Sequence, residues 1–204
     1  MESEIAAQAW DSALWLTLVA VLALLCLSAF FSGSETALTA ASRGKLHGLA
    51  DRGNRGADTA LKLTEDNERL IGAILLGNNL VNILATSLAT STLTLIFGDS
   101  GVALATLVMT ALVLVFAEVM PKTYAISNPE AAATRVSPII AIVVRVLAPI
   151  VNIVRALVRT FLRLFGVETD PEANLLAAQE EIAGAINLHH SEGAVEKDDK
   201  DRLL

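Results

Sequence analysis

Three clusters of polar residues lie within or at the ends of long apolar stretches, and their side chains could bind a cation. The clusters run from Ser28 to Thr36, from Gly77 to Asn82 and from Glu118 to Lys122. They supply hydroxyl, amide and carboxylate oxygens, the ligands that hard divalent cations choose, and Mg2+ takes six of them in an octahedron. Because the sequence has no cluster of His or Cys, zinc and copper are poor candidates.

The spacing within the clusters indicates how these oxygens could converge. Ser28 and Ser32 are four residues apart and share one face of a helix, and Asn78 and Asn82 repeat that spacing. Glu118 would add the carboxylate. A single carboxylate leaves a bound Mg2+ one charge short of neutral, which suits a transport site that must release its ion.

Gly33 and Pro121 have a second predicted role. Each could loosen the end of its helix and expose backbone carbonyls as extra ligands, which is tolerated at membrane depth where the backbone lines a cavity.

Structural roles compete with this interpretation. Ser and Asn within a membrane helix often bond across helices or back to a carbonyl four residues earlier. Glu118 could simply pair with Lys122, since Glu ahead of Lys at this spacing stabilises a helix by a few tenths of a kcal/mol. We expect Glu118 at the C-terminal end of its helix, where the helix dipole disfavours an anion. Carboxylates inside a membrane are nevertheless rare and usually functional.

Three uncharged runs supply the elements that would position these residues. Residues 12–34, 70–98 and 100–117 contain no Asp, Glu, Lys or Arg. About 20 apolar residues cross the roughly 30 Å of hydrocarbon in a bilayer. The chain is 53% hydrophobic and only 18% charged, whereas a soluble domain has about 25% charged residues. The sequence therefore predicts an all-α polytopic membrane protein with spans at about 12–34, 70–97 and 101–119.

The Lys and Arg residues predict the orientation of these spans. Residues 1–11 and the turn at 97–101 have none, whereas the segment 42–69 has six. The positive-inside rule then places the N-terminus outside and the helical loop 42–69 in the cytoplasm, with everything after the third span. At 1.5 Å per residue, Asn78 lies roughly 12 Å along the second span. All three polar clusters consequently fall in the cytoplasmic half of the membrane.

The segment of about 130–165 is open to two interpretations. It is long and apolar, but residues 138–165 contain Pro149 and four arginines, which would be costly in hydrocarbon. A kinked amphipathic juxtamembrane helix at the interface would place the arginines near lipid phosphates. A fourth span is the alternative. Asn128-Pro129 is the expected start of this helix, with Glu130 in its first turn.

The remaining composition excludes several classes of function. Residues 1–165 are neutral overall, and the whole net charge of −7 lies in the acidic tail 167–204. There is no basic face for nucleic acid, and the single Cys26 allows no disulfide within the chain. The spans contain no paired carboxylates, catalytic His or zinc motif, and the serines lack a base, so an enzyme is not expected.

In this order, the three clusters resemble the transmembrane domain of the CNNM/CorC family of magnesium transporters, and the bacterial branch looks closer. The matching text is FFSGSETA at 30–37, LGNNLVN at 76–82 and AEVMPK at 117–122. The resemblance covers about residues 10–166. It implies a homodimer in the prokaryotic plasma membrane, with one Mg2+ site per protomer, three spans and a belt-like juxtamembrane helix within 12–166.

The resemblance also implies Mg2+ export driven by Na+ entry, with no covalent cofactor. A membrane anchor that senses Mg2+ without transporting it is the alternative. Family members continue into paired CBS domains that bind nucleotide, and we expect those to be absent here after the tail. Carried onto this sequence, the implied metal ligands are Ser28, Ser32, Asn78 and Glu118, assisted by the backbone at Gly33. Further residues expected to line the site are Ser34, Asn79, Asn82, Pro121 and Lys122.

Overall fold

The computed structural model describes residues 2–165, and side chains from residue 13 onward. Every element within this range is helical, which confirms the all-α prediction. The described residues divide after Asn152 into two compact units. The elements are α1 (Glu2–Ala40), α2 (Arg43–Asp51), α3 (Arg55–Glu65), α4 (Asn67–Phe97), α5 (Ser100–Leu112), the π-helix η1 (Val113–Val119), α6 (Met120–Ser127) and α7 (Pro129–Leu164). The predicted tail 167–204 lies outside the described residues.

Four helical segments of the described chain are long and apolar enough to cross a membrane. They are Ala13–Ala40, Asn67–Phe97, Ser100–Ser127 and Pro129–Leu164. Large apolar side chains cover their outward faces, and examples are Leu16, Ile83 and Leu107, all more than two-thirds exposed. Contiguous apolar surface on this scale is unusual on a soluble monomer and is what a lipid-facing helix requires. The prediction of a membrane protein is therefore confirmed.

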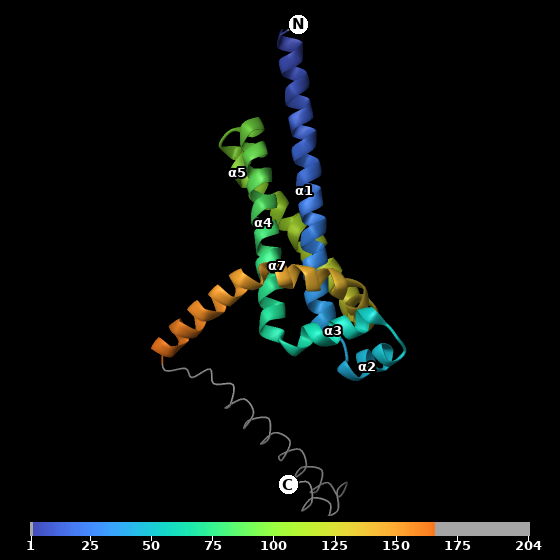
Figure 1. Cartoon of the computed structure of the whole chain (residues 1–204). Coiled ribbons are helices and arrows are strands. Elements are labelled where there is room, and N and C mark those ends of the chain that lie inside the picture. Colours follow the sequence, from blue (N-terminus) through green and yellow to red (C-terminus); the bar gives the residue numbers. More distant parts are fainter. Residues whose placement is uncertain (1, 166–204) are drawn as a thin grey trace, which may run out of the picture. The chain divides into compact units, whose positions relative to one another are not determined.

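The core of the first unit lies where α1 packs against α4, and α5, η1 and α6 complete the bundle (Figure 1). Phe31, Leu38, Leu70 and Ile74 are almost fully buried there. The two helices approach closely at Gly77, where an added Cβ would lie 2.8 Å from Phe31 Cζ. Small residues at such crossings allow helix backbones to meet in a membrane, where packing drives association.

A tight turn joins α4 to α5. Gly98 ends α4 with φ of 63°, a conformation that side chains with a Cβ rarely adopt. The chain then reverses so closely that a Cβ on Gly101 would lie 2.3 Å from Leu93 O. The turn therefore sets α4 and α5 side by side as an antiparallel pair (Figure 1).

The polar segment between the first two candidate spans is helical, as the sequence predicts, and it forms two short helices with a break at Gly53 and Asn54. Asn54 caps α3 by accepting from Ala57 N at 3.1 Å. The start of α7 docks on this segment, because Ser137 Oγ donates to Gly56 O at 2.6 Å. α7 begins at Pro129, also as predicted.

Two expectations about helix ends are wrong. α1 runs unbroken through Gly33 to Ala40, so Gly33 does not loosen a helix end. Gly33 instead permits close packing, since its added Cβ would lie 3.3 Å from Pro121 Cβ. Glu118 is not at a helix C-terminus either, because the helical segment continues to Ser127.

Candidate cation site

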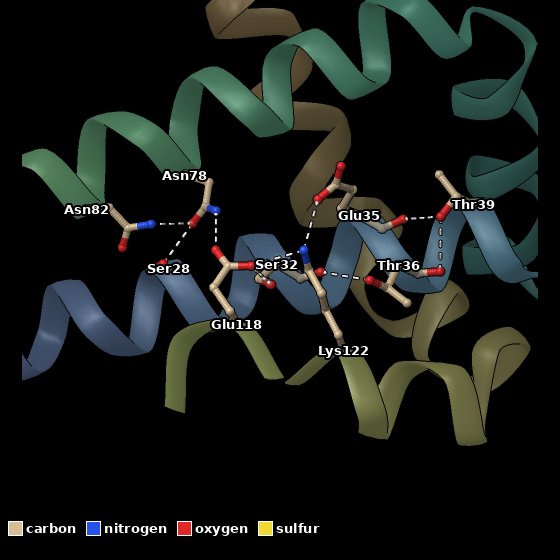
Figure 2. A network of polar contacts seen from close by, with 9 residues as sticks. All are labelled: Ser28, Ser32, Glu35, Thr36, Thr39, Asn78, Asn82, Glu118 and Lys122. Atoms are coloured by element: carbon tan, nitrogen blue, oxygen red, sulfur yellow. Dashed lines mark hydrogen bonds and ion pairs between the residues drawn. The ribbon is translucent and has the colours of Figure 1, made fainter. Parts of the chain in front are cut away.

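The polar side chains from the three clusters meet where α1, α4 and η1 pack together. α1 contributes Ser28 and Ser32, α4 contributes Asn78, and η1 contributes Glu118 (Figure 2). The hydrogen bonds that join one element to another connect residues 40 to 86 positions apart in the sequence. Their contact is therefore a product of tertiary packing.

Asn78 is the centre of the network. Its Oδ1 accepts from Ser28 Oγ at 2.7 Å, and its Nδ2 donates to Glu118 Oε1 at 3.0 Å. Asn82 Nδ2 lies 3.5 Å from the same Oδ1, at the limit of a hydrogen bond. Asn82 Oδ1 is buried and has no hydrogen-bond partner, so one amide oxygen beside the network retains its full acceptor capacity.

The Glu118 carboxylate is engaged on both oxygens. While Oε1 accepts from Asn78, Oε2 accepts from Ser32 Oγ at 3.1 Å and pairs with Lys122 Nζ at 2.9 Å. Hydrogen bonds to an ionised acceptor are among the stronger polar contacts in proteins. The carboxylate is consequently held in one orientation by three neighbours.

The network is buried but rich in oxygen. Ser28 and Ser32 are 0% exposed and Asn78 is 8% exposed. Two hydroxyls, one amide oxygen and both carboxylate oxygens converge, a donor set that suits a hard cation. Within residues 2–165, no group of three or more His, Cys, Asp or Glu side chains could hold a metal ion. The arrangement can therefore act as a site with one carboxylate and several neutral oxygens.

The π-helix positions Glu118 in a way that the sequence does not reveal. Residues Val113–Val119 form a π-helix, and Met120 N donates to Val115 O five residues earlier. Pro121 follows directly and has no N–H to donate to the preceding turn, which is a local reason for the irregular register. Short π segments inside α-helices are frequent at functional sites. Pro121 therefore does not loosen a helix end as expected, because the helical segment continues to Ser127, and the irregular register lies just before Pro121.

Several predicted site residues point elsewhere. Ser34 is buried, but its Oγ donates to Phe30 O at 2.6 Å, within its own helix. Asn79 is exposed. Gly33 and Pro121 pack against each other, as described above. Lys122, in contrast, joins the network through Glu118.

Sequence reasoning missed Glu35 as a site residue. Its Oε2 lies 4.0 Å from Lys122 Nζ, so a second carboxylate stands one side chain away from Glu118. Glu35 is three residues after Ser32 in the same helix, and extending the helical-face argument by one turn would have found it.

A groove beside Glu118 was also missed. Its volume is about 350 Å3, and its polar lining includes Asn82, Thr86, Thr106 and Thr110. A second groove of about 680 Å3 shares Asn82 and Thr86 and continues along α4 to Thr90 and Ser91. Thr and Ser at this helical spacing were present in the sequence as a polar stripe between apolar residues.

The chain is similar to known membrane proteins. The family model described as Cyclin M transmembrane N-terminal domain (CNNM) matches residues 18–199. The UPF0053 inner membrane protein YfjD of Escherichia coli is 40% identical over 178 residues, which cover 87% of this chain and 41% of that protein. A UPF0053 protein of Haemophilus influenzae is 36% identical over 156 residues, covering 76% and 37%. The polyamine export protein of Haemophilus influenzae is 30% identical over 166 residues, covering 75% and 38%. The chain thus spans about two fifths of the length of these relatives.

Proposed function

The chain belongs to the CNNM family of transmembrane domains, and from that premise we propose that it carries Mg2+ across the membrane through the polar network. One observation carries the proposal. Five oxygens from Ser28, Ser32, Asn78 and Glu118 converge from three helical elements, inside segments that could span a bilayer. Glu118 adds a carboxylate to them, and ionisable side chains inside a membrane are costly and commonly mark ion pathways, proton relays or counter-ion sites.

The chemistry of the site supports release as well as binding. Mg2+ prefers near-octahedral oxygen coordination and usually keeps some of its water. One carboxylate neutralises only half of its charge, so the neutral hydroxyl and amide oxygens supply selectivity while the ion remains able to leave. A transporter needs this balance, because an ion bound too tightly is not conducted.

Mg2+ flux into proteoliposomes tests the proposal. Purified protein is reconstituted into liposomes that enclose a Mg2+-sensitive dye, and Mg2+ is added to the outside solution. We expect Glu118→Gln to abolish flux and to eliminate heat of Mg2+ binding in calorimetry. Glu130→Gln is the matched control. Glu130 is also a carboxylate paired with a lysine, since its Oε1 lies 3.1 Å from Lys45 Nζ, but it does not belong to the polar network. Equal Mg2+ affinity in Glu118→Gln and wild type would remove the carboxylate from the site, and binding without flux in wild type would favour a sensor.

The same flux assay addresses the direction and coupling of transport, and light scattering addresses assembly. We propose Mg2+ export coupled to Na+ entry by a homodimer in a plasma membrane. An imposed Na+ gradient should then accelerate Mg2+ movement in the opposite direction. Light scattering of the detergent-solubilised protein should give twice the protomer mass, and a monomeric mass would contradict the dimer.

We further propose three spans with an interfacial α7, although α7 is long enough to cross a membrane. The arginines along α7 support this arrangement, because they favour phosphates over hydrocarbon. In a Cys26→Ser background, a membrane-impermeant maleimide should label Asp99→Cys from outside intact cells but not Phe165→Cys. Labelling of both from outside would instead indicate four spans.

The grooves beside α4 suggest the path of the ion between the site and the turn that ends α4. Their Thr and Ser side chains extend from Glu118 along the helix toward the turn that ends α4. Hydroxyl oxygens can replace water around a cation as it moves. We expect Thr86→Val to slow Mg2+ flux while leaving the calorimetric affinity unchanged, and loss of affinity would place Thr86 in the site itself.

A polyamine is a second candidate cargo, favoured by one contact. Lys122 already places a primary ammonium 2.9 Å from Glu118 Oε2, so the site accommodates an alkylammonium group. One relative is named a polyamine export protein. Flux of radiolabelled spermidine, unaffected by excess Mg2+, would favour this cargo over the divalent ion.

A further inference from the structure

Lys122 lies between two carboxylates, and the proposed ligand set does not require it. Its Nζ is 2.9 Å from Glu118 Oε2 and 4.0 Å from Glu35 Oε2 (Figure 2). Its side chain is 41% exposed, whereas those of Glu118 and Glu35 are 27% and 26% exposed. Lys122 is therefore the most exposed of these three charged side chains.

The ammonium and a cargo ion would compete for one oxygen. Lys122 Nζ contacts Glu118 Oε2, the oxygen that also accepts from Ser32 Oγ. A cation that coordinates this oxygen would lie within a few ångströms of the ammonium. Two positive charges at such a separation, in partly buried surroundings, repel each other strongly. A cargo cation on this oxygen would therefore favour displacement of the ammonium from Glu118.

Glu35 provides a destination for the displaced ammonium. Glu35 belongs to α1 and Lys122 to α6, and these helices pack together. The four-carbon stem of Lys is flexible, and the gap to Glu35 Oε2 is already only 4.0 Å. A rotation of the side chain, without movement of the helices, is sufficient to complete the new ion pair.

We propose that Lys122 is a tethered competitor for the cargo cation, transferring from Glu118 to Glu35 as the cation enters and returning as it leaves. The inference rests on the proposed function of the Glu118 site. Such an exchange keeps a cation beside Glu118 at every stage, so that this carboxylate is never without a positive partner inside the membrane. It also lowers the affinity for the cargo, which promotes release.

Calorimetric titration of the purified wild-type and Lys122→Gln proteins with Mg2+ tests the competition. If the ammonium competes, Lys122→Gln should bind Mg2+ more tightly, by a factor within the roughly 5- to 150-fold range of typical site coupling. If Lys122 only holds the Glu118 side chain in its orientation, Lys122→Gln should bind Mg2+ more weakly than wild type, and that result would overturn the proposal. Lys62→Gln is the matched control, since Lys62 pairs with Asp58 at the same spacing on an exposed helix, and its Mg2+ affinity should equal that of wild type.

A double-mutant cycle with Glu35 tests the transfer itself. Glu35→Gln removes the alternative partner of Lys122, so the ammonium should stay on Glu118. Because it then competes more strongly with the cargo, Mg2+ should bind about tenfold more weakly, and this effect should depend on the presence of Lys122. In a Lys122→Gln background the same change should have almost no effect. If Glu35→Gln weakens binding equally in both backgrounds, Glu35 acts only through its own charge and the transfer is refuted.

The outcomes separate this proposal from the one on which it rests. Loss of binding in Glu118→Gln with weaker binding in Lys122→Gln would leave the proposed function standing and overturn only the competitor. Absence of Mg2+ binding in the wild-type protein would overturn both. Thermal unfolding of each variant, monitored by circular dichroism, confirms that affinities are compared between folded proteins.

Discussion

Two acid–lysine pairs in this chain share one helical spacing but lie in different surroundings. Asp58 and Lys62 pair at 2.7 Å on α3, and Glu118 and Lys122 pair at 2.9 Å across η1 and α6. Both have the acid four residues before the lysine, an arrangement worth about 0.2–0.5 kcal/mol in an isolated helix. The first pair is exposed, whereas Glu118 also accepts from Asn78 and Ser32. Spacing therefore creates an ion pair in both places, and neighbours from other helices make one of the two pairs part of the candidate cation site.

The largest effect is expected from exchanging the members of each pair. Glu118→Lys combined with Lys122→Glu retains an ion pair at the same spacing but moves the carboxylate away from Asn78. We expect no detectable Mg2+ binding in calorimetry, because the oxygens from α1 and α4 lose their charged partner. The corresponding exchange of Asp58 and Lys62 should leave Mg2+ affinity unchanged. Preserved binding in the first exchange would show that the pair alone suffices.

Removal of the central amide should have the next largest effect. Asn78→Ala leaves Ser28 and Glu118 without one hydrogen-bond partner each, and unsatisfied buried groups cost about 1–3 kcal/mol. We expect at least a tenfold loss of Mg2+ affinity, which corresponds to about 1.4 kcal/mol, together with a lower unfolding temperature. Unchanged affinity would restrict Asn78 to a structural role.

A change in packing tests how rigidly α1 and α4 must meet. A Cβ at Gly77 would lie 2.8 Å from Phe31 Cζ, whereas a Cβ at Gly48 on α2 would meet nothing within 4 Å. We expect Gly77→Ala to destabilise the fold by about 1–3 kcal/mol through overpacking and to weaken Mg2+ binding. Gly48→Ala should instead stabilise its helix by up to about 1 kcal/mol. Equal unfolding midpoints in the two variants would refute the close approach.

The smallest effect concerns the exposed pair. The hydrogen bond and charge of Asp58 raise the pKa of Lys62 above its ordinary value. A raised pKa in the folded state means that the pair contributes stability below the unfolded-state pKa of Lys62 and loses it as pH rises through the folded-state value. Asp58→Asn should lower the pKa of Lys62 toward the ordinary value, as measured by NMR titration of its side-chain resonances. No change in that pKa would show that the pair does not persist in solution.

Much of the fold could be predicted because its signals are local. Uncharged runs mark the candidate membrane segments, Gly98 lies in the expected turn at 97–101, and Pro129 marks the start of α7. Each reflects the cost of charge in hydrocarbon or the conformational range of one residue. The length of α1 was underestimated, because Gly33 suggests a helix end unless one knows that Pro121 packs against it.

The sequence alone determined which oxygens could gather: residue type, helical spacing and span boundaries indicated Ser28, Ser32, Asn78, Asn82 and Glu118. Only the tertiary structure decided how they bond, that Glu118 lies in a π-helix, and that Glu35 stands within reach of Lys122. The physical reason is range. Propensity and the avoidance of buried charge act through a few neighbouring residues, whereas hydrogen bonds between residues 40 to 86 positions apart depend on how whole helices pack.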